Sequence, residues 1–453
     1  MLSKNLQRAA SNAVARSTAT SSCRNSNAAA AASCSRLHHL RRTSTPSDVS
    51  IRPLHTLSRP TRKAGDWMPG SRHQDTDLVH AAITPEEKSG AIITPVYQST
   101  TFVQESVEKY LAKGFSYSRT NNPTVSTLEA KVAEIEGGVG AVCTGTGMAA
   151  TTIVMSTFLA QGDHCVITDC SYGGTNRLCR VQFEKYGIEF SFVDFRDNDA
   201  IRKAMKPNTK LIWSEAPSNP LLGLVDLEEV SKIAHEHGAL HCCDATFATP
   251  VMLKPLDWGC DLTMQSLTKF YDGHNIGTGG AVVAKTQELF EAIKLGQNMH
   301  GNIMAPQVAF TILQTMKSMS LRVRRQSETA TKIATWLESH PKVTNVCYPG
   351  TKHPQKAIAD KYHREGVHGA MLWFEVDGNP ITLMNEIERP WSLCENLGAT
   401  ESIITACAVM THANMVKEDR LKVGITDGFI RVSCGIEDAD DLIKALDRAL
   451  QKC

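Results

Sequence analysis

Two spacings of hydrophobic residues alternate through the middle of the chain. Short apolar runs predict buried strands at 140–144, 164–169, 189–194, 210–215 and 240–244. Apolar residues every three or four positions predict helices at 124–138, 147–161, 175–187, 197–205 and 227–238. Strands that alternate with helices predict an α/β fold with right-handed crossovers and a mostly parallel sheet. Ligands of such sheets gather at the carboxyl ends of the strands.

The pattern changes after about residue 310. One long helical stretch is predicted at 305–340, followed by strands within 370–378 and 429–437 and an amphipathic helix at 438–452. We therefore expect a large domain at 125–310 and a smaller C-terminal α+β domain at 311–453. Residues 66–124, which contain the run AIITPVYQSTTFV, predict an extended arm that lies across another surface.

Charge separates the first 65 residues from the rest. They contain eleven lysines and arginines and one acid, a net charge of +10, so the remaining chain carries −9 of the total of +1. A leader rich in Ser, Ala and Arg predicts organelle import and disorder. Its basic amphipathic start favours the mitochondrion over the plastid, and a cytoplasmic protein with a basic tail is the alternative. The acidic body argues against nucleic acid as a partner.

Cysteine usage and hydropathy narrow the class of protein further. No apolar run approaches the ~20 residues that a membrane span needs, so we expect no membrane partner. The fourteen cysteines of this large chain are expected to be reduced thiols. Cys242 and Cys243 have no C-x-x-C partner, which argues against a zinc site, and we expect no metal.

The run AVCTGTGMAA contains a G-x-G-x-x-A turn between a predicted strand and a predicted helix. Such a turn is the fingerprint of dinucleotide binding, and Asp163 or Asp169 lies near the spacing expected for a ribose-binding acid. However, nothing downstream supplies a hydride-transfer site. Backbone N–H groups and the helix dipole at such a turn favour any phosphate, so a monophosphate cofactor is the alternative.

Pyridoxal phosphate makes further demands, and the chain meets them in order. The cofactor needs a Schiff-base lysine, an acid at the pyridine nitrogen, hydroxyls at the phosphate and an aromatic ring against its own. Asp244 ends a predicted strand, and the segment TMQSLTKFYDGH presents Ser266, Thr268 and Lys269. Tyr172 follows another predicted strand. Burial next to a cationic ring would lower the pKa of Lys269, as a nucleophilic amine requires.

Arg431 lies in the middle of a predicted strand in which Ile430, Val432 and Cys434 share one face. An unpaired charge among apolar neighbours is costly, so the guanidinium needs an anionic partner. The residues alone leave two alternatives open, a structural ion pair and a clamp for a substrate carboxylate.

Many segments together resemble one known family, the pyridoxal-phosphate-dependent enzymes of Cys/Met metabolism. The similar segments are YSRTNNPT, TGTGMAA, YGGTNR, EAPSNP, DATFATP, SLTKFYDGH, MTHANM and IRVSCGIED, and the resemblance extends over about residues 90 to 450. The resemblance implies an aspartate aminotransferase-like large domain of fold type I and a small C-terminal domain. It also implies that the arm contacts a neighbouring subunit and that dimers pair into a homotetramer.

The resemblance also implies roles for individual residues. Lys269 would form the Schiff base and move protons between Cα, Cβ and Cγ, and Tyr172 would stack on the ring and activate the incoming amine. The residues implied to bind the cofactor are Gly147, Met148, Asp244, Thr246, Ser266 and Thr268, with Tyr117 and Arg119 reaching the neighbouring subunit's phosphate. The residues implied to bind substrate are Asn219, Arg431, Ser402, Glu401 and Arg177, with Arg431 as the clamp for the α-carboxylate.

Within the family, several segments most resemble cystathionine γ-synthases, which join cysteine to an activated homoserine. A cystathionine γ- or β-lyase is the first alternative and an O-acylhomoserine sulfhydrylase the second. Ser116 and Ile276 stand where cystathionine-handling members usually carry an acid, which puts the substrate in doubt. Gly173–Gly174 argues against a methionine γ-lyase, which carries Cys in that turn.

Two readings outside this chemistry remain. A nicotinamide-dependent dehydrogenase would explain the glycine turn and would leave Lys269, Asp244 and Arg431 without a role. A non-catalytic relative would be expected to lack at least one of these three residues, and all three are present.

Overall fold

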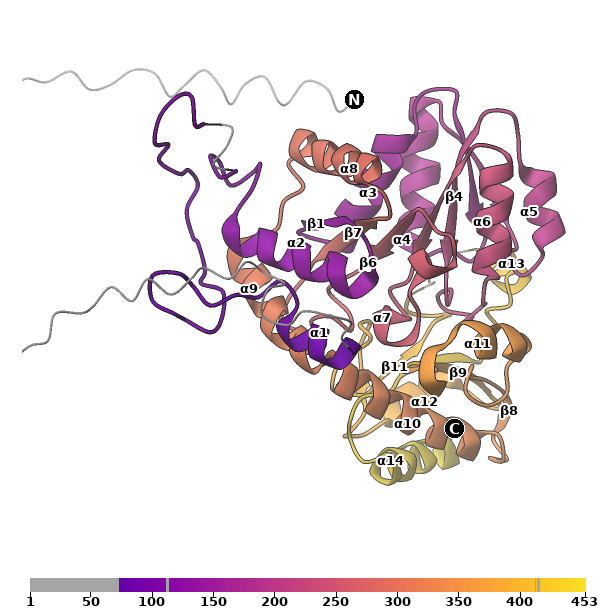
Figure 1. The fold of residues 1–453 in the computed structure, drawn as a ribbon. Helices are drawn as coiled ribbons and strands as arrows, with labels where there is room; N and C mark the ends of the chain where they lie inside the picture. The colour runs from indigo at the N-terminus through magenta and orange to yellow at the C-terminus, as the bar shows by residue number, and fades with distance from the viewer. Residues whose placement is uncertain (1–72, 111–113, 412, 414–415) are drawn as a thin grey trace, which may run out of the picture. The chain divides into compact units, whose positions relative to one another are not determined.

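The computed structural model describes residues 73–110, 114–411, 413 and 416–453 (Figure 1). They belong to one compact unit assigned to 60–453. The predicted leader, residues 1–65, and the first residues of the predicted arm lie outside the described residues. In the described part of the chain, no helix is long and apolar enough to cross a membrane.

A seven-stranded sheet forms the larger layer. Its order is β1-β7-β6-β5-β4-β2-β3, and β7 alone runs antiparallel to its neighbours. The predicted α/β class and mostly parallel sheet are confirmed. The strands are β1(Gly140–Thr144), β2(His164–Thr168), β3(Glu189–Val193), β4(Thr209–Glu215), β5(Leu240–Asp244), β6(Leu262–Gln265) and β7(Gly280–Ala284). The sequence analysis did not predict β6 and β7.

Helices cover both faces of this sheet, which is why its central strands are apolar at successive positions. On one face, Cys143, Val166 and Ile212 pack with α2(Pro123–Glu136) and α6(Leu227–Glu236). The neighbouring strand residues point to the opposite face, where they pack with α3(Gly147–Phe158) and α8(Gln287–His300). The other elements of this part are α4(Gly173–Arg177), a π-helical turn Leu178–Phe183, α5(Asn198–Ala204), α7(Thr249–Met252) and the 3₁₀ turns Glu184–Tyr186 and Pro255–Trp258.

A five-stranded sheet with the order β10-β11-β12-β9-β8 forms the second layer. It is antiparallel except for the pair β10–β11. Helices α10, α12 and α14 pack against it around a separate apolar cluster. The strands are β8(Val343–Cys347), β9(Met371–Val376), β10(Ser392–Leu393), β11(Ile403–Ala406) and β12(Phe429–Ser433), and the helices are α10(Met319–Leu337), α11(Lys356–Tyr362), α12(Pro380–Glu386), α13(Lys417–Lys422) and α14(Ala439–Lys452), with a 3₁₀ turn at Arg364–Gly366.

The single helix predicted at 305–340 is wrong. The stretch divides into α9(Pro306–Thr315), a 3₁₀ turn Met316–Ser318 and α10. The carbonyl oxygen of Thr315 accepts hydrogen bonds from Ser318 Oγ (3.1 Å) and Arg322 Nη2 (3.0 Å). Two side chains therefore bind a carbonyl oxygen that would accept a backbone N–H in a continuous helix.

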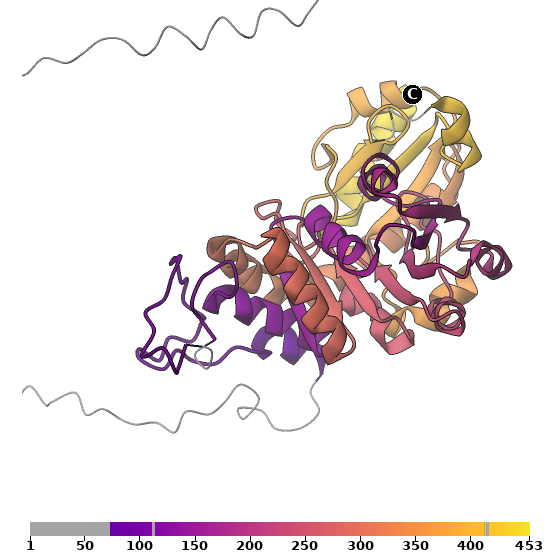
Figure 2. The ribbon, with the colours of Figure 1, turned by 90° about the horizontal axis from the view of Figure 1, so that it is seen from above.

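The predicted arm is extended only in part. Its described start forms the short helix α1(Gln74–His80), whose Leu78 is buried in the same cluster as α2. Lys131 Nζ donates to the carbonyl of Val79 (3.1 Å) and holds the end of α1 against α2. The following segment appears in Figures 1 and 2 as an indigo loop away from both sheets. Val103 and Val107 there are 87% and 88% exposed. The predicted contact with a neighbouring subunit stays a prediction.

Candidate active site

A cavity of about 630 Å³ lies at the carboxyl ends of the parallel strands. The ends of β4 and β5 and the segment after β6 form its floor, and the first turns of α3 and α4 form one wall. The smaller sheet contributes Arg431 of β12 and residues 395–397. Strand ends that meet at one edge of a parallel sheet explain why residues far apart in the sequence converge here.

One end of the cavity suits an anion. The N–H groups of Gly147 and Met148 lie in the first turn of α3, where helix geometry leaves them without an intrahelical acceptor. Ser266 and Thr268 face the same space. A Cβ on Gly147 would lie 3.0 Å from Ser266 Oγ, a tight contact, so glycine favours this close approach of helix and hydroxyl. Thr246 Oγ1 accepts from the Ser266 N–H (2.8 Å) and fixes that segment.

Two carboxyl groups lie side by side at the floor. Asp244 ends β5 and is paired in register with Glu215, which ends β4. Burial raises the pKa of Asp244 to about 6, although hydrogen bonds from Thr246 oppose the shift. Burial and the neighbouring Asp244 raise the pKa of Glu215 well above its usual range. Glu215 Oε1 accepts from the backbone N–H of Tyr172 (2.7 Å), so this acid also positions the first turn of α4.

Lys269 points its amine into the same cavity. Its Nζ donates to Asn396 Oδ1 (2.7 Å). Burial and, to a smaller extent, the positive charge of Arg431 lower the pKa of this amine to about 8, and Glu395 opposes the shift. A large share of the amine is therefore neutral near pH 8, which is the form that attacks a carbonyl.

Arg431 closes the other side of the cavity. Its side chain projects from β12 and is only 3% exposed. Nη1 donates to Asn219 Oδ1 (2.9 Å) and Nη2 to the carbonyl of Glu395 (3.0 Å). Within the described residues the guanidinium forms no salt bridge, so the structural ion pair left open by the sequence is not found there. As predicted, Ile430 and Val432 belong to the apolar cluster on the other face.

The wall between these ends is formed by Tyr172 and the start of α4. The Tyr172 side chain is 48% exposed and lies against Gly174, where a Cβ would be 2.5 Å from the ring. The glycine thus makes room for the ring. Arg177, at the end of α4, also lines the cavity, and the structure gives its side chain no acceptor among the described residues.

Four residues named from the sequence do not line the cavity. Arg119 Nη1 donates to the Asn298 side chain (2.7 Å), and Tyr117 is 45% exposed, so their predicted role on a neighbouring subunit stays a prediction. Ser402 is fully buried, and its hydroxyl donates to Glu437 Oε2 (2.8 Å). Glu401 Oε2 accepts from a neighbouring side chain, that of Asn275 (3.1 Å). The other eleven named residues line the cavity: Lys269, Tyr172, Gly147, Met148, Asp244, Thr246, Ser266, Thr268, Asn219, Arg431 and Arg177.

Sequence reasoning missed several polar residues of the cavity, among them Glu215 and Asn396. Glu215 lies in the segment EAPSNP, and a carboxyl group at the end of a predicted parallel strand was the available signal. Asn396 lies in a loop without periodic pattern, and nothing in the sequence pointed to it.

The residues present fit pyridoxal 5′-phosphate. The first turn of α3 and the hydroxyls of Ser266 and Thr268 match the phosphate, the Asp244 carboxyl matches a protonated pyridine nitrogen, and Lys269 supplies the amine. The fit rests on the close approach of α3 and Ser266 at Gly147 and on the two carboxyl groups of Asp244 and Glu215 at the floor of the cavity. In the described residues, no group of His, Cys, Asp and Glu side chains is placed to hold a metal ion.

Comparisons with known proteins agree with this arrangement. A family model described as Cys/Met metabolism PLP-dependent enzyme matches residues 75–451. The chain belongs to this family. It is therefore a PLP-dependent enzyme of Cys/Met metabolism, and its expected fold type is confirmed by solved structures of the family.

Three similar proteins illustrate the range of the family. Cystathionine beta-lyase of Coxiella burnetii (strain RSA 493 / Nine Mile phase I) is 42% identical over 83% of this chain and 98% of its own. Cystathionine gamma-lyase of Bacillus subtilis (strain 168) is 40% identical over the same shares. The structure of cystathionine gamma synthase from Xanthomonas oryzae pv. oryzae, in complex with aminoacrylate and cysteine, has a TM-score of 0.81 and 36% identity, and covers 84% of this chain and 99% of that one.

Proposed function

We propose that this enzyme is a cystathionine γ-synthase, which replaces the γ-substituent of an O-acylated or phosphorylated homoserine with the sulfur of cysteine. The product has two carboxylates, one on each amino acid. The observation that supports this proposal is the pair of arginines on one cavity. Arg431 lies deep beside Asn219, and Arg177 lies on the wall formed by α4. A substrate with one carboxylate would leave one of the two cations without a partner.

Each residue then has a defined task. Arg431 and Asn219 bind the α-carboxylate, while the exposed guanidinium of Arg177 receives the carboxylate of the second amino acid. Lys269, with its lowered pKa, takes a proton from Cα and returns protons at the neighbouring carbons. The cofactor, when bound, supplies an electron sink for the negative charge that develops on the substrate. Asp244 keeps that sink effective by stabilising a proton on the ring nitrogen.

A cystathionine lyase is the second candidate. It is favoured by the names of the two curated relatives described above, which are a β-lyase and a γ-lyase. A lyase would use the same two arginines, because cystathionine is then the substrate instead of the product. Ser116 and Ile276, the residues that stand where an acid is usual, bear on the binding of the distal amine in both readings.

The deciding experiment supplies the full chain, loaded with pyridoxal phosphate, with O-acetyl-, O-succinyl- or O-phosphohomoserine plus cysteine. The synthase proposal expects cystathionine, detected by mass, only when both an ester and cysteine are present. In parallel, the enzyme is given cystathionine. Homocysteine with pyruvate would identify a β-lyase, and cysteine with 2-oxobutanoate a γ-lyase.

Sulfide in place of cysteine tests the remaining alternative, an O-acylhomoserine sulfhydrylase, which would form homocysteine. Arg177→Gln is the matched variant: we expect its KM for cysteine to rise about tenfold and its KM for the ester to stay near the wild-type value. An equal effect on both substrates would contradict the assignment of Arg177 to the second carboxylate.

We further propose that the chain works as a homotetramer of two dimers in which Tyr117 and Arg119 complete the neighbouring cavity. The exposed apolar side chains of the arm support this proposal, because Ile92 and Val107 are 79% and 88% exposed. Light scattering of the full chain tests it. A mitochondrial destination for the basic leader is also a proposal, and localisation of a fusion to residues 1–65 tests it.

A further inference from the structure

A row of polar side chains leads from the Lys269 amine away from the cavity. Lys269 Nζ donates to Asn396 Oδ1 (2.7 Å), and Asn396 Nδ2 donates to Asn275 Oδ1 (2.5 Å). Asn275 Nδ2 in turn donates to Glu401 Oε2 (3.1 Å). Lys269 and Asn396 line the cavity, whereas Asn275 and Glu401 do not line it and are exposed. The row thus connects the amine to a carboxylate that does not line the cavity.

The groups at the two ends of the row, an ammonium and a carboxylate, determine how the two amide side chains between them are oriented. A carboxylate only accepts hydrogen bonds, so Asn275 must turn its NH₂ group toward Glu401 and its oxygen toward Asn396. Asn396 must then turn its NH₂ group toward Asn275 and its oxygen toward Lys269. An ammonium only donates, so the protonated Lys269 requires the same orientation from the other end. Both amides are therefore oriented without ambiguity.

The backbone holds the middle of the row in place. Asp272 is fully buried, and its Oδ2 accepts from the N–H of Ile276 (3.0 Å). This hydrogen bond closes a tight loop in which Asn275 has φ 58°, a left-handed conformation that Asn tolerates better than most residues. The N–H of Thr400 donates to the carbonyl of Gly273 (2.9 Å), which joins the loop to the segment carrying Glu401. The backbone segments that carry Asn275 and Glu401 are thus joined to each other.

We propose that Asn396 and Asn275 are positioning residues through which Glu401 orients the Lys269 amine. The proposal rests on the proton-transfer role given to Lys269 above. While the amine is not bonded to the cofactor, the Asn396 oxygen holds one of its N–H bonds. The nitrogen lone pair is then directed away from Asn396 and is free to meet a proton from the substrate. Without the row, the amine rotates freely among several directions.

The proposal predicts the behaviour of the Lys269 amine in the cofactor-free full chain. The charged groups that act on this amine are Arg431, which lowers its pKa, and Glu395, which raises it. Its pKa is obtained from the pH dependence of modification by an amine-reactive reagent, with the peptide that contains Lys269 quantified by mass. Asn396→Leu removes the acceptor and is expected to lower the pKa by about one unit. Asn396→Asp places a charged acceptor there and is expected to raise it.

Two variants of the distant carboxylate separate hydrogen-bond orientation from charge. Glu401→Gln still offers an oxygen to Asn275, so the pKa of Lys269 is expected to stay at the wild-type value. Glu401→Ala releases both amides and is expected to lower it, by about half the effect of Asn396→Leu. Equal values in both Glu401 variants, or an unchanged pKa in both Asn396 variants, would overturn the proposal.

Asn275→Gly guards against a failure of the other variants to fold. Glycine keeps the left-handed backbone without strain and deletes only the amide, so the loop is expected to persist. In Asn275→Gly the pKa of Lys269 is expected to fall by the same amount as in Glu401→Ala. A wild-type pKa would contradict the proposed role of Asn275. No substrate enters these measurements. If the cystathionine assays contradict the synthase proposal, the pKa measurements on Lys269 still stand. If the pKa measurements contradict the role of Asn396, Asn275 and Glu401, the cystathionine assays still stand.

Discussion

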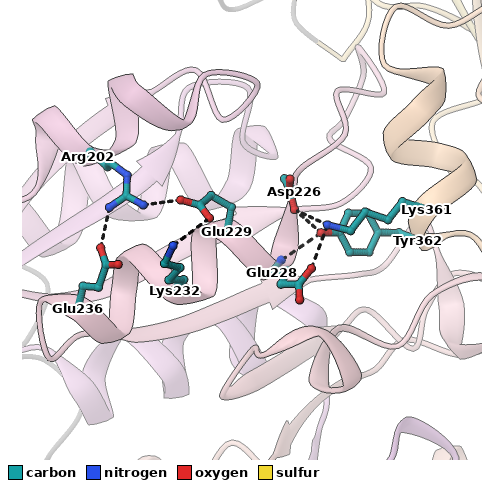
Figure 3. Close-up of polar contacts among 8 residues, drawn as sticks. All are labelled: Arg202, Asp226, Glu228, Glu229, Lys232, Glu236, Lys361 and Tyr362. Atoms are coloured by element: carbon teal, nitrogen blue, oxygen red, sulfur yellow. Dashed lines mark hydrogen bonds and ion pairs between the residues drawn. The ribbon is translucent and has the colours of Figure 1, made fainter.

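Charged residues gather in two regions of this protein with opposite electrostatic outcomes. The first region lies on the surface around α6 (Figure 3). Arg202 of α5 pairs with Glu229 and Glu236 of α6, and the Glu236 contact is 2.6 Å. Hydrogen bonds with these two acids raise the pKa of Arg202, and its hydrogen bond lowers the pKa of Glu236. Arg202 and Glu236 are thus held more firmly in their charged forms.

The same figure shows the second half of this surface cluster. Lys361 of α11 contacts Glu228 (3.0 Å) and Asp226 (3.3 Å), and the Tyr362 hydroxyl donates to Asp226. Burial alone would raise the pKa of Asp226, but the hydrogen bonds from Tyr362 and Lys361 hold it below its usual value. These contacts join α6, a helix that covers the larger sheet, to α11.

The cavity shifts the pKa of four charged groups in the other direction. Burial lowers the pKa of Lys269 and Arg431 and raises that of Asp244 and Glu215. The four groups are buried without forming ion pairs with one another, so each is pushed toward its neutral form. Surface charges that satisfy one another stabilise the fold a little. Buried charges without partners cost stability, and such sites mark function because a ligand can complete them.

The largest expected effect is that of Lys269→Met. Activity is expected to fall by roughly 10³-fold or more, because the Schiff-base amine and proton carrier is lost. The same variant is expected to raise the melting temperature of the cofactor-free protein by a few degrees, since a buried amine is replaced by an apolar chain of similar length. Calorimetry and the cystathionine assays measure both effects.

The pH dependence sharpens this prediction. The pKa of Lys269 is about 8 in the folded state, against 10.5 for the free side chain. Between these values the unfolded chain binds more protons, so the wild-type protein gains stability as the pH rises from 8 to 10.5. The advantage of Lys269→Met is therefore expected to be full at and below pH 8 and to shrink above it. An advantage independent of pH would contradict the burial of a charged amine.

An intermediate effect is expected from Arg431→Lys. Lysine keeps the charge but loses the fork that binds a carboxylate with two parallel hydrogen bonds. We expect KM for the amino-acid substrate to rise roughly 10- to 100-fold while the protein stays folded. Arg322→Lys serves as the matched control, because this buried arginine donates to the carbonyls of Phe270 and Thr315 outside the cavity. It should lower the melting temperature and change KM little.

The smallest effect is expected from Arg202→Gln on the surface. Breaking two exposed ion pairs is expected to lower the melting temperature by roughly 1–2 °C and to leave the kinetic constants unchanged. Salt screens exposed pairs, so the difference from wild type should vanish in 1 M sodium chloride. A large loss that persists at high salt would mean that the two regions do not differ as the pKa shifts indicate.

Much of the larger sheet and most of the cavity could be predicted from the sequence. The first five strands have short apolar runs, and local spacing predicts them because all but the edge strand β3 are largely buried on both faces. Asp244 ends a predicted parallel strand, so its place at the cavity follows from the rule for parallel sheets. Lys269 follows β6, which was not predicted, and Arg431 belongs to the antiparallel part of the smaller sheet, so this rule does not place these two at the site. The strands β6 and β7 were missed. Their short runs LTMQ and GAVVA lie among loop residues and show no period.

Other features were decided only by tertiary contacts. Arg322 donates to the Thr315 carbonyl at the break between α9 and α10, and the described start of the arm is helical where Leu78 and Lys131 bind it to α2. Asn396 reaches Lys269 from 127 positions away in the sequence. Local patterns record which side of an element faces the core, and this much the amino-acid sequence determined by itself. Which polar groups meet depends on chain segments brought together by folding, because a hydrogen bond acts over about 3 Å whatever the separation along the chain.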